Sequence, residues 1–301
     1  MSDEAIVVQG LRKAYGDKVA VNGVDLTVHR GEVFALLGPN GAGKTTTVEI
    51  MEGYRRRDGG DVLVLGEDPA RAGSAWRARV GIVLQGTGEF EELRVDEVVR
   101  LFASYYPRGD DPDSVIDRVG LAEKRRALTH TLSGGQKRRL DVALGIVGRP
   151  ELLFLDEPTT GFDPEARREF WELIRDLAGS GTTILLTTHY LQEAEELAGR
   201  VGVIADGRII AVATPAELGG RADSAATISW VGAEGPRSVR TTTPTEYVLK
   251  LRAEFGGGEV PGLTVARPTL EEVYLEMIQG SEMIQGSEMT QGSETVQGSQ
   301  A

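Results

Sequence analysis

The stretch GPNGAGKTT at residues 38–46 has residue types and spacing suited to binding phosphate groups. It fits the pattern G-x-x-x-x-G-K-[ST] at Gly38, Gly43, Lys44 and Thr45. An apolar run precedes it and a helix-compatible run follows it, which is the context that the pattern requires. Glycine lets backbone N–H groups turn toward phosphate oxygens, and the following helix adds its positive N-terminal end. Lys44 would reach the β- and γ-phosphates and Thr45 would ligate magnesium, whereas the simpler alternative is a glycine-rich turn between a strand and a helix.

Two adjacent carboxylates, Asp156 and Glu157, follow the continuous apolar run LLFL at 152–155. Such a run is typical of a strand that is buried on both faces of a parallel sheet. Ligands of open parallel sheets bind beyond the carboxyl ends of the strands. Asp156 could therefore hold magnesium, and Glu157 could polarise an attacking water. In isolation the pair fits a solvated turn as well, but the phosphate loop favours the catalytic interpretation.

A second pair of glycines lies in LSGGQ at 132–136, which opens a helix whose apolar residues recur with helical spacing. Ser133 is placed to cap this helix. Gly134 and Gly135 are poor helix formers, but they allow the backbone to approach an anion closely. Capping alone is the simpler interpretation, and the surrounding motifs favour a second anion-binding element.

Four further side chains lie at turns or strand ends. Tyr15 lies in an early turn, where its ring either packs or offers a surface for adenine. His189 follows a strand expected at Thr183 to Thr187, so its imidazole could contact the γ-phosphate. Gln85 ends an earlier strand. Asp163 precedes a proline and is expected to cap the next helix.

The composition is that of an ordinary globular protein with an acidic balance. Of 301 residues, 40% are hydrophobic and 26% are charged, which allows one substantial core and a small second domain. A formal net charge of -13 argues against nucleic-acid partners, because that affinity comes mainly from lysine and arginine. The absence of cysteine excludes disulfides, thiolate metal sites and cysteine nucleophiles, and it fits a reducing cytosol.

Neither a secretory signal nor a membrane span is expected. The N-terminus MSDEAIVVQG lacks a basic segment followed by an apolar one. No apolar run approaches the roughly 20 residues that cross a bilayer. Any membrane association is therefore expected to come through a partner.

The remaining patterns predict how the chain is organised. Short β-type runs between residues 5 and 37 predict a β-rich layer that leads into the phosphate loop. Strands are expected at Val62 to Leu65 and Val80 to Leu84, and a hairpin is expected around Asp206-Gly207. Between about residues 89 and 149 the chain is charge-rich and helical, which predicts a helical insertion between strands of one sheet.

We expect three parts: a main domain at 1–220, a small accessory domain at 221–275 and a tail at 276–301. The accessory segment holds short β-type runs and one or two helices, without recognisable chemistry. The tail repeats units related to EMIQGS every six residues. Such short periods can build a β-solenoid, but these few units cannot bury a core, so a disordered tail is expected.

The phosphate loop, LSGGQ and LLFLDE together resemble the nucleotide-binding domain of ATP-binding cassette (ABC) transporters, over about residues 5–220. LSGGQ separates this family from other P-loop ATPases. The resemblance implies an α/β P-loop NTPase fold with a mixed, largely parallel sheet, a β-rich layer and a helical subdomain, followed here by the small α+β extension. It also implies that the ligands are ATP and Mg²⁺.

The resemblance assigns a role to each motif residue. It makes Glu157 the catalytic base, His189 the switch histidine, and Gln85 a glutamine that touches magnesium and the transmembrane partner. Magnesium would be held by Thr45, Gln85 and Asp156. Phe162 stands where the inter-subunit loop of Asp163 usually has leucine. The nucleotide would be bound by Tyr15, Gly38, Asn40, Gly41, Ala42, Gly43, Lys44, Thr45, Thr46, Ser133, Gly134, Gly135, Gln136 and Asp163.

The same resemblance implies a head-to-tail pair of nucleotide-binding subunits. ATP would lie between the phosphate loop of one subunit and LSGGQ of the other, and hydrolysis would drive a separately encoded transmembrane permease. The chain would then be cytoplasmic and peripheral on the inner face of the cell membrane. The stretches TTGFDPEARREFW at 159–171 and TLEEVYLEM at 269–277 resemble ATPases of ABC-2-type exporters, the daunorubicin-resistance group.

Two alternatives remain open at this point. One is the ATPase of an importer, although 222–275 is short for the regulatory domains common there. The other is a soluble ABC-type ATPase that acts on ribosomes or DNA. Ribosome-acting members usually carry two cassettes and DNA-repair types a long coiled coil, whereas this chain has one cassette and no heptad run.

Overall fold

Two compact units, Met1–Val212 and Ala213–Ala301, make up the chain in the computed structural model. The structure describes residues 3–83, 90–221 and 223–280. The sequence led us to expect the main domain to end near residue 220, and the division into units falls shortly before that point. None of the helices in the described ranges combines the length and the apolar character needed to cross a membrane.

A six-stranded sheet in the order β5-β6-β7-β3-β8-β9 forms the core of the first unit. Neighbours from β5 to β8 run parallel. Residues of β3, β6 and β7 are all buried except Asp156, and most of them are apolar, as expected for strands covered on both faces. The strands are β3 (Val33–Leu37), β5 (Val80–Val83), β6 (Leu152–Asp156), β7 (Thr183–Thr188), β8 (Arg200–Ala205) and β9 (Arg208–Ala213).

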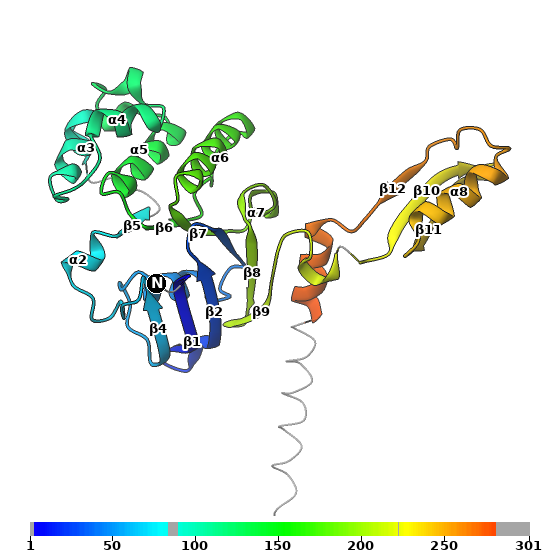
Figure 1. Ribbon diagram of the computed structural model, residues 1–301, viewed down its shortest axis with the longest axis horizontal. Coiled ribbons are helices and arrows are strands. Elements are labelled where there is room, and N and C mark those ends of the chain that lie inside the picture. The colour runs from blue at the N-terminus through cyan, green and yellow to red at the C-terminus, as the bar shows by residue number, and fades with distance from the viewer. Residues whose placement is uncertain (1–2, 84–89, 222, 281–301) are drawn as a thin grey trace, which may run out of the picture. The chain divides into compact units, whose positions relative to one another are not determined.

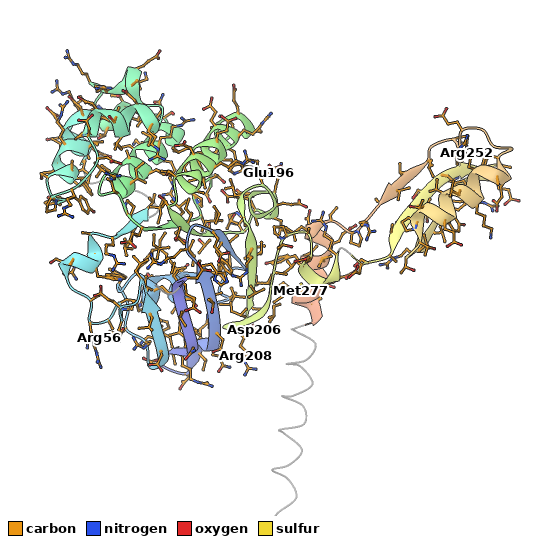
Figure 2. The ribbon with its side chains drawn as sticks, in the orientation of Figure 1. Arg56, Glu196, Asp206, Arg208, Arg252 and Met277 are labelled. Atoms are coloured by element: carbon orange, nitrogen blue, oxygen red, sulfur yellow. The ribbon has the colours of Figure 1, made fainter. Side chains whose placement is uncertain are left out.

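The register of this sheet brings three functional stretches to one edge. Leu37 at the end of β3 pairs with Thr188, and Asp156 at the end of β6 pairs with Thr187. The phosphate loop, the carboxylate pair and His189 each follow one of these neighbouring strand ends. The expected hairpin is present as well, with Asp206 and Arg208 at the turn between β8 and β9 (Figure 2).

A second, antiparallel sheet in the order β2-β1-β4 packs its apolar residues into the same core. Its strands are β1 (Glu4–Tyr15), β2 (Lys18–His29) and β4 (Gly59–Val64). The β-rich layer is thus confirmed, but β1 and β2 are longer than the short runs expected. The two strands stay paired through polar residues and across several register shifts. These shifts interrupt the alternation of apolar and polar residues by which a strand is predicted from sequence.

A group of helices separates β5 from β6, as the helical insertion predicted. Helices α3, α4 and α5 gather together in Figure 1 and pack against one another. The first unit contains α1 (Lys44–Met51), α2 (Ser74–Arg77), α3 (Val95–Ala103), α4 (Pro112–Arg118), α5 (Gly134–Ile146), α6 (Pro164–Gly179) and α7 (Leu191–Leu197), with short 3₁₀ turns at Ala122–Lys124 and Thr129–Thr131.

The second unit is the expected small α+β extension. Its sheet, in the order β11-β10-β12, packs on α8 around the core residues Ile228, Trp230, Leu251 and Val260. Its elements are η4 (Leu218–Gly220), β10 (Ala226–Gly232), β11 (Gly235–Thr241), α8 (Pro244–Glu254), β12 (Thr264–Ala266) and a helix over 270–280.

The last helix enters the segment for which we expected disorder. It continues through residues 276–280, so the first repeat unit begins as helix rather than as a disordered tail. Leu270 and Val273 are buried, and Met277 lies on the same helical face, next to Gly219 (Figure 2). The apolar stripe of the helix therefore extends into the repeat. The rest of the expected tail, 281–301, lies outside the described residues.

Candidate nucleotide-binding site

The phosphate loop needs glycine at two of its positions for steric reasons. Gly43 has φ 102°, and a Cβ there would lie 2.3 Å from the carbonyl oxygen of Ala20. At Gly38 a Cβ would lie 2.3 Å from the carbonyl oxygen of Ile204. These contacts are too short for any side chain, so both glycines allow close packing of backbone on backbone.

Lys44 begins α1 and is buried, with 6% of its surface exposed. Its Nζ donates to the carbonyl oxygens of Gly38 at 2.7 Å and Pro39 at 3.1 Å, which holds the ammonium inside the loop. Burial lowers the pKa of Lys44, and the nearby Glu157 and Asp156 oppose that effect. The first turn of α1 has no side-chain cap and no acidic residue, so its N–H groups are free to bind an anion.

The carboxylate pair is held by Thr187 from the neighbouring strand. The Thr187 hydroxyl donates to Asp156 Oδ1 and accepts from the Glu157 N–H at 3.1 Å. Glu157 has φ 43°, a left-handed conformation that costs energy in a residue other than glycine. Its N–H also donates to the Thr187 carbonyl at 3.1 Å, so these contacts maintain the unusual backbone.

His189 and Glu157 meet beyond the strand ends. His189 Nδ1 lies 3.3 Å from Glu157 Oε1, and the Thr160 hydroxyl lies 3.4 Å from Glu157 Oε2. The imidazole packs on Tyr190 with ring centroids 4.1 Å apart. Glu157 is therefore oriented by a histidine on one side and a hydroxyl on the other.

A cavity of about 250 Å³ lies over the phosphate loop and is lined by half of the expected nucleotide-binding residues. Tyr15 is 43% exposed at its edge, with the cations of Lys13 and Arg55 5.5 and 5.3 Å from its ring. An exposed ring of this kind suits stacking better than packing in a core. The cavity is lined by Tyr15, Lys18, Ala20, Asn40, Gly41, Gly43, Lys44, Thr45, Thr46 and Glu157.

Ser133 and Asp163 do not line this cavity. Ser133 caps α5 in a reciprocal box, accepting from the Gln136 N–H at 3.3 Å while Gln136 Oε1 accepts from the Ser133 N–H at 3.1 Å. Asp163 caps α6 by accepting from the N–H groups of Glu165 and Ala166 at 3.0 and 2.8 Å. Both predicted caps are confirmed. Ser133, Gly134 and Asp163 are exposed, whereas Leu132 is buried and Gly135 and Gln136 are half-buried.

The described residues offer oxygen ligands for magnesium at Thr45 and Asp156. They contain no cluster of three or more histidine, aspartate or glutamate side chains that could hold a metal alone. This chemistry fits Mg²⁺, which protein sites hold through one or two carboxylates together with waters and phosphate oxygens. Gln85, the third expected ligand, lies outside the described residues.

Arg138 is a residue of the site that we did not anticipate. It comes from α5, is 8% exposed, and donates from Nη2 to the Asp156 carbonyl at 2.7 Å and from Nε to the Pro158 carbonyl at 3.1 Å. Burial lowers the pKa of Arg138, while Asp141, Asp156 and Glu193 oppose that effect. The helix that begins at LSGGQ thereby holds the turn that carries the carboxylates. Its signal in the sequence is the charged pair Arg138 and Asp141, which interrupts the apolar face of α5.

Comparisons with known proteins agree with the family resemblance that the motifs indicated. The sequence matches the family described as "ABC transporter" over residues 21–160. A daunorubicin resistance ATP-binding protein of Streptomyces coeruleorubidus is 39% identical over 305 residues, covering 92% of this chain and 96% of that protein. A Nod factor export ATP-binding protein of Cupriavidus pinatubonensis is 45% identical over 217 residues, covering 69% of this chain and 66% of that protein.

A dimeric ATP-binding cassette, solved in a post-hydrolysis state with ADP and Pi, has a TM-score of 0.63 at 21% identity and shares the fold. The match covers 69% of this chain and 98% of the chain of that cassette. The Streptomyces match carries more weight, because it is not confined to the phosphate-binding motifs but extends over 92% of the chain. On this evidence, together with the geometry around Lys44 and Glu157, the chain belongs to the ABC transporter family as an ATP-binding subunit and is an ATPase.

Proposed function

We propose that this ATPase powers an ABC-2-type exporter through a separately encoded permease, using Mg²⁺-dependent hydrolysis of ATP at the cavity over residues 38–46. The observation that carries the proposal is the convergence of Lys44, Glu157 and His189 at one edge of the parallel sheet. Relatives named for daunorubicin resistance and for Nod factor export support the direction of transport. They point to efflux of a drug or another hydrophobic compound.

The residues divide the work of ATP binding. Tyr15 stacks on the adenine, and the loop N–H groups and Lys44 hold the phosphate chain. Thr45 and Asp156 would hold Mg²⁺, which when bound neutralises charge on the phosphates. The hydrogen bond from the Thr187 hydroxyl holds one oxygen of the Asp156 carboxylate, whose charge acts on Lys44 of the phosphate loop.

Glu157 acts as the general base that takes the proton of the attacking water. It is anchored at its backbone by Thr187 and at its side chain by Thr160 and His189, so its carboxylate is held at the open side of the cavity. His189 touches the same carboxylate and is placed to sense the γ-phosphate. A fixed base raises the rate because the water does not have to be oriented afresh in each turnover.

We further propose that the complete site needs a second subunit, arranged head to tail. Ser133, Gly134 and Asp163 are exposed and lie outside the lining of the cavity of their own chain, although LSGGQ presents glycine-rich backbone at a helix start. A second copy would bring such backbone to the open side of the phosphates. The cassette of the same fold that was solved with ADP and Pi is dimeric, which supports the pairing of two subunits.

The test is Glu157→Gln, measured by ATP turnover and by size in solution with ATP. We expect turnover to fall by about 100-fold or more, while ATP binding persists and ATP-bound dimers accumulate. Glu172→Gln is the matched control, because Glu172 is an exposed glutamate outside the site. Turnover at the wild-type rate in Glu157→Gln would refute the assignment of the base.

A further inference from the structure

Glu193, in the first turn of α7, is fully buried with 0% of its surface exposed. Other polar residues of the same helix, Gln192, Glu195 and Glu196, are exposed. Glutamate is rarely buried without partners, because removing its charge from water is costly. The burial of the Glu193 carboxyl must therefore be explained by the groups that surround it inside the protein.

Three potential hydrogen-bond donors face this carboxyl from three different elements. They are the hydroxyl of Thr188 at the end of β7, the hydroxyl of Thr159 in the loop after β6, and the indole N–H of Trp171 in α6. Within the described residues, both carboxyl oxygens of Glu193, Thr159 Oγ1 and Trp171 Nε1 are buried without a partner in hydrogen-bond geometry. An acceptor and two unused donors thus face one another, which is uncommon in a protein interior.

The charges around Glu193 come from two neighbouring helices. Burial raises the pKa of Glu193 overall, and the cation of Arg167 in α6 opposes that effect. The charge of Glu193 in turn opposes the lowering of the pKa of Arg138 in α5. Arg167 also lies 4.8 Å from the ring of Tyr190, which packs on His189.

The position of Glu193 joins two parts of the ATPase site. Thr159 opens the loop that runs from Glu157 to Asp163, and Thr188 directly precedes His189. Glu193 itself is not among the residues that line the cavity. A contact from its carboxyl to Thr159 and Thr188 would make the loop of Asp163 and the strand end of His189 move together.

We propose that Glu193 is a positioning residue for hydrolysis, which couples the loop of Asp163 to His189 through Thr159 and Thr188. This proposal rests on the roles proposed above for Glu157, His189 and the second subunit. When the partner engages the loop, a small shift closes the hydrogen bonds that Glu193, Thr159 and Trp171 leave unmade. The imidazole is then held against Glu157 in the geometry needed for turnover.

The experiment compares Glu193→Leu, Glu193→Gln and the exposed control Glu195→Gln in the full chain. The readouts are kcat, the dissociation constant of a fluorescent ATP analogue, and the melting temperature. In Glu193→Leu we expect kcat to fall at least about tenfold, since misplacing catalytic groups is costly, with analogue affinity unchanged. Glu193→Gln should restore most of the activity, because its amide oxygen accepts the same hydrogen bonds.

Thr159→Val provides a second route if Glu193→Leu does not fold. Thr159→Val should lower kcat in the same way. In a variant that combines Thr159→Val with Glu193→Leu, the two effects should not add, because contacting residues couple. Wild-type kcat in Glu193→Leu or Thr159→Val, additive effects, or a parallel loss of analogue binding would overturn the proposal. Failure of the proposed base would appear separately, as turnover in Glu157→Gln.

Discussion

Replacing Glu52 with glutamine should stabilise the first unit, and the gain should grow as the pH rises. Glu52 directly follows α1, is 8% exposed, and lines a cavity of about 400 Å³ together with Trp76, Tyr106 and Asp141. Burial, with smaller contributions from Asp156 and Glu49, raises the pKa of Glu52 from 4.5 to about 7. The folded protein therefore holds this proton at a pH at which the unfolded chain releases it.

The sign and the size of the effect follow from that difference. The raised pKa of Glu52 stabilises the folded state fully below pH 4.5, and this contribution is lost as the pH rises toward and through about 7. One pKa unit corresponds to about 1.4 kcal/mol, so from pH 5 to pH 8 the loss is about 2.5 kcal/mol. Glutamine does not ionise, so Glu52→Gln should avoid this loss.

The assay is denaturant unfolding of wild type and variant at pH 5 and pH 8. The difference in unfolding free energy between Glu52→Gln and wild type should increase by about 2.5 kcal/mol over this interval. Glu172→Gln, at an exposed carboxyl, should show little change with pH. A difference that is constant with pH, or that shrinks toward pH 8, would refute the reasoning about burial.

Two further predictions concern the phosphate loop and the signature. Gly43→Ala should abolish ATP binding and lower the melting temperature, because its Cβ would lie 2.3 Å from the Ala20 carbonyl oxygen. Gly73→Ala, where a Cβ would have no atom within 4 Å, should do neither. Unchanged ATP affinity in Gly43→Ala would contradict this prediction. Ser133→Ala should cost about 1 kcal/mol of stability through the lost cap of α5, leave ATP binding intact and reduce turnover. Asp111→Ala, which removes the cap of α4, should cost a similar amount of stability but leave turnover unchanged. Equal turnover in these two cap variants would count against a role for LSGGQ beyond capping.

Motifs whose parts are adjacent in the chain could be interpreted from the sequence. The loop at 38–46 and the caps Ser133 and Asp163 depend on spacings of a few residues, so the local sequence is enough to predict them. The apolar run before Asp156 also predicted a buried parallel strand. The positions of these motifs at strand ends and helix starts therefore agree with the prediction.

Features that depend on pairing or on distant packing were not predictable in the same way. The strands β1 and β2 extend through polar residues because each supplies hydrogen bonds to the other. The last helix reaches residue 280 because Val273 and Met277 pack at Gly219, far away in the sequence. Arg138 and Glu193 have the residue types of a solvated helix face, and only their neighbours make them buried.

The sequence by itself determined which chemical groups this protein has: a glycine loop of the kind that suits phosphate, a carboxylate pair of the kind that suits magnesium and water, and a second glycine-rich helix start. The tertiary structure decided which of these groups meet. Parallel pairing of β6 with β7 brings Thr187 to Asp156 and places His189 3.3 Å from Glu157, across about thirty residues of chain. The same fold keeps Ser133 and Asp163 out of the cavity, because helices α5 and α6 begin outside its lining.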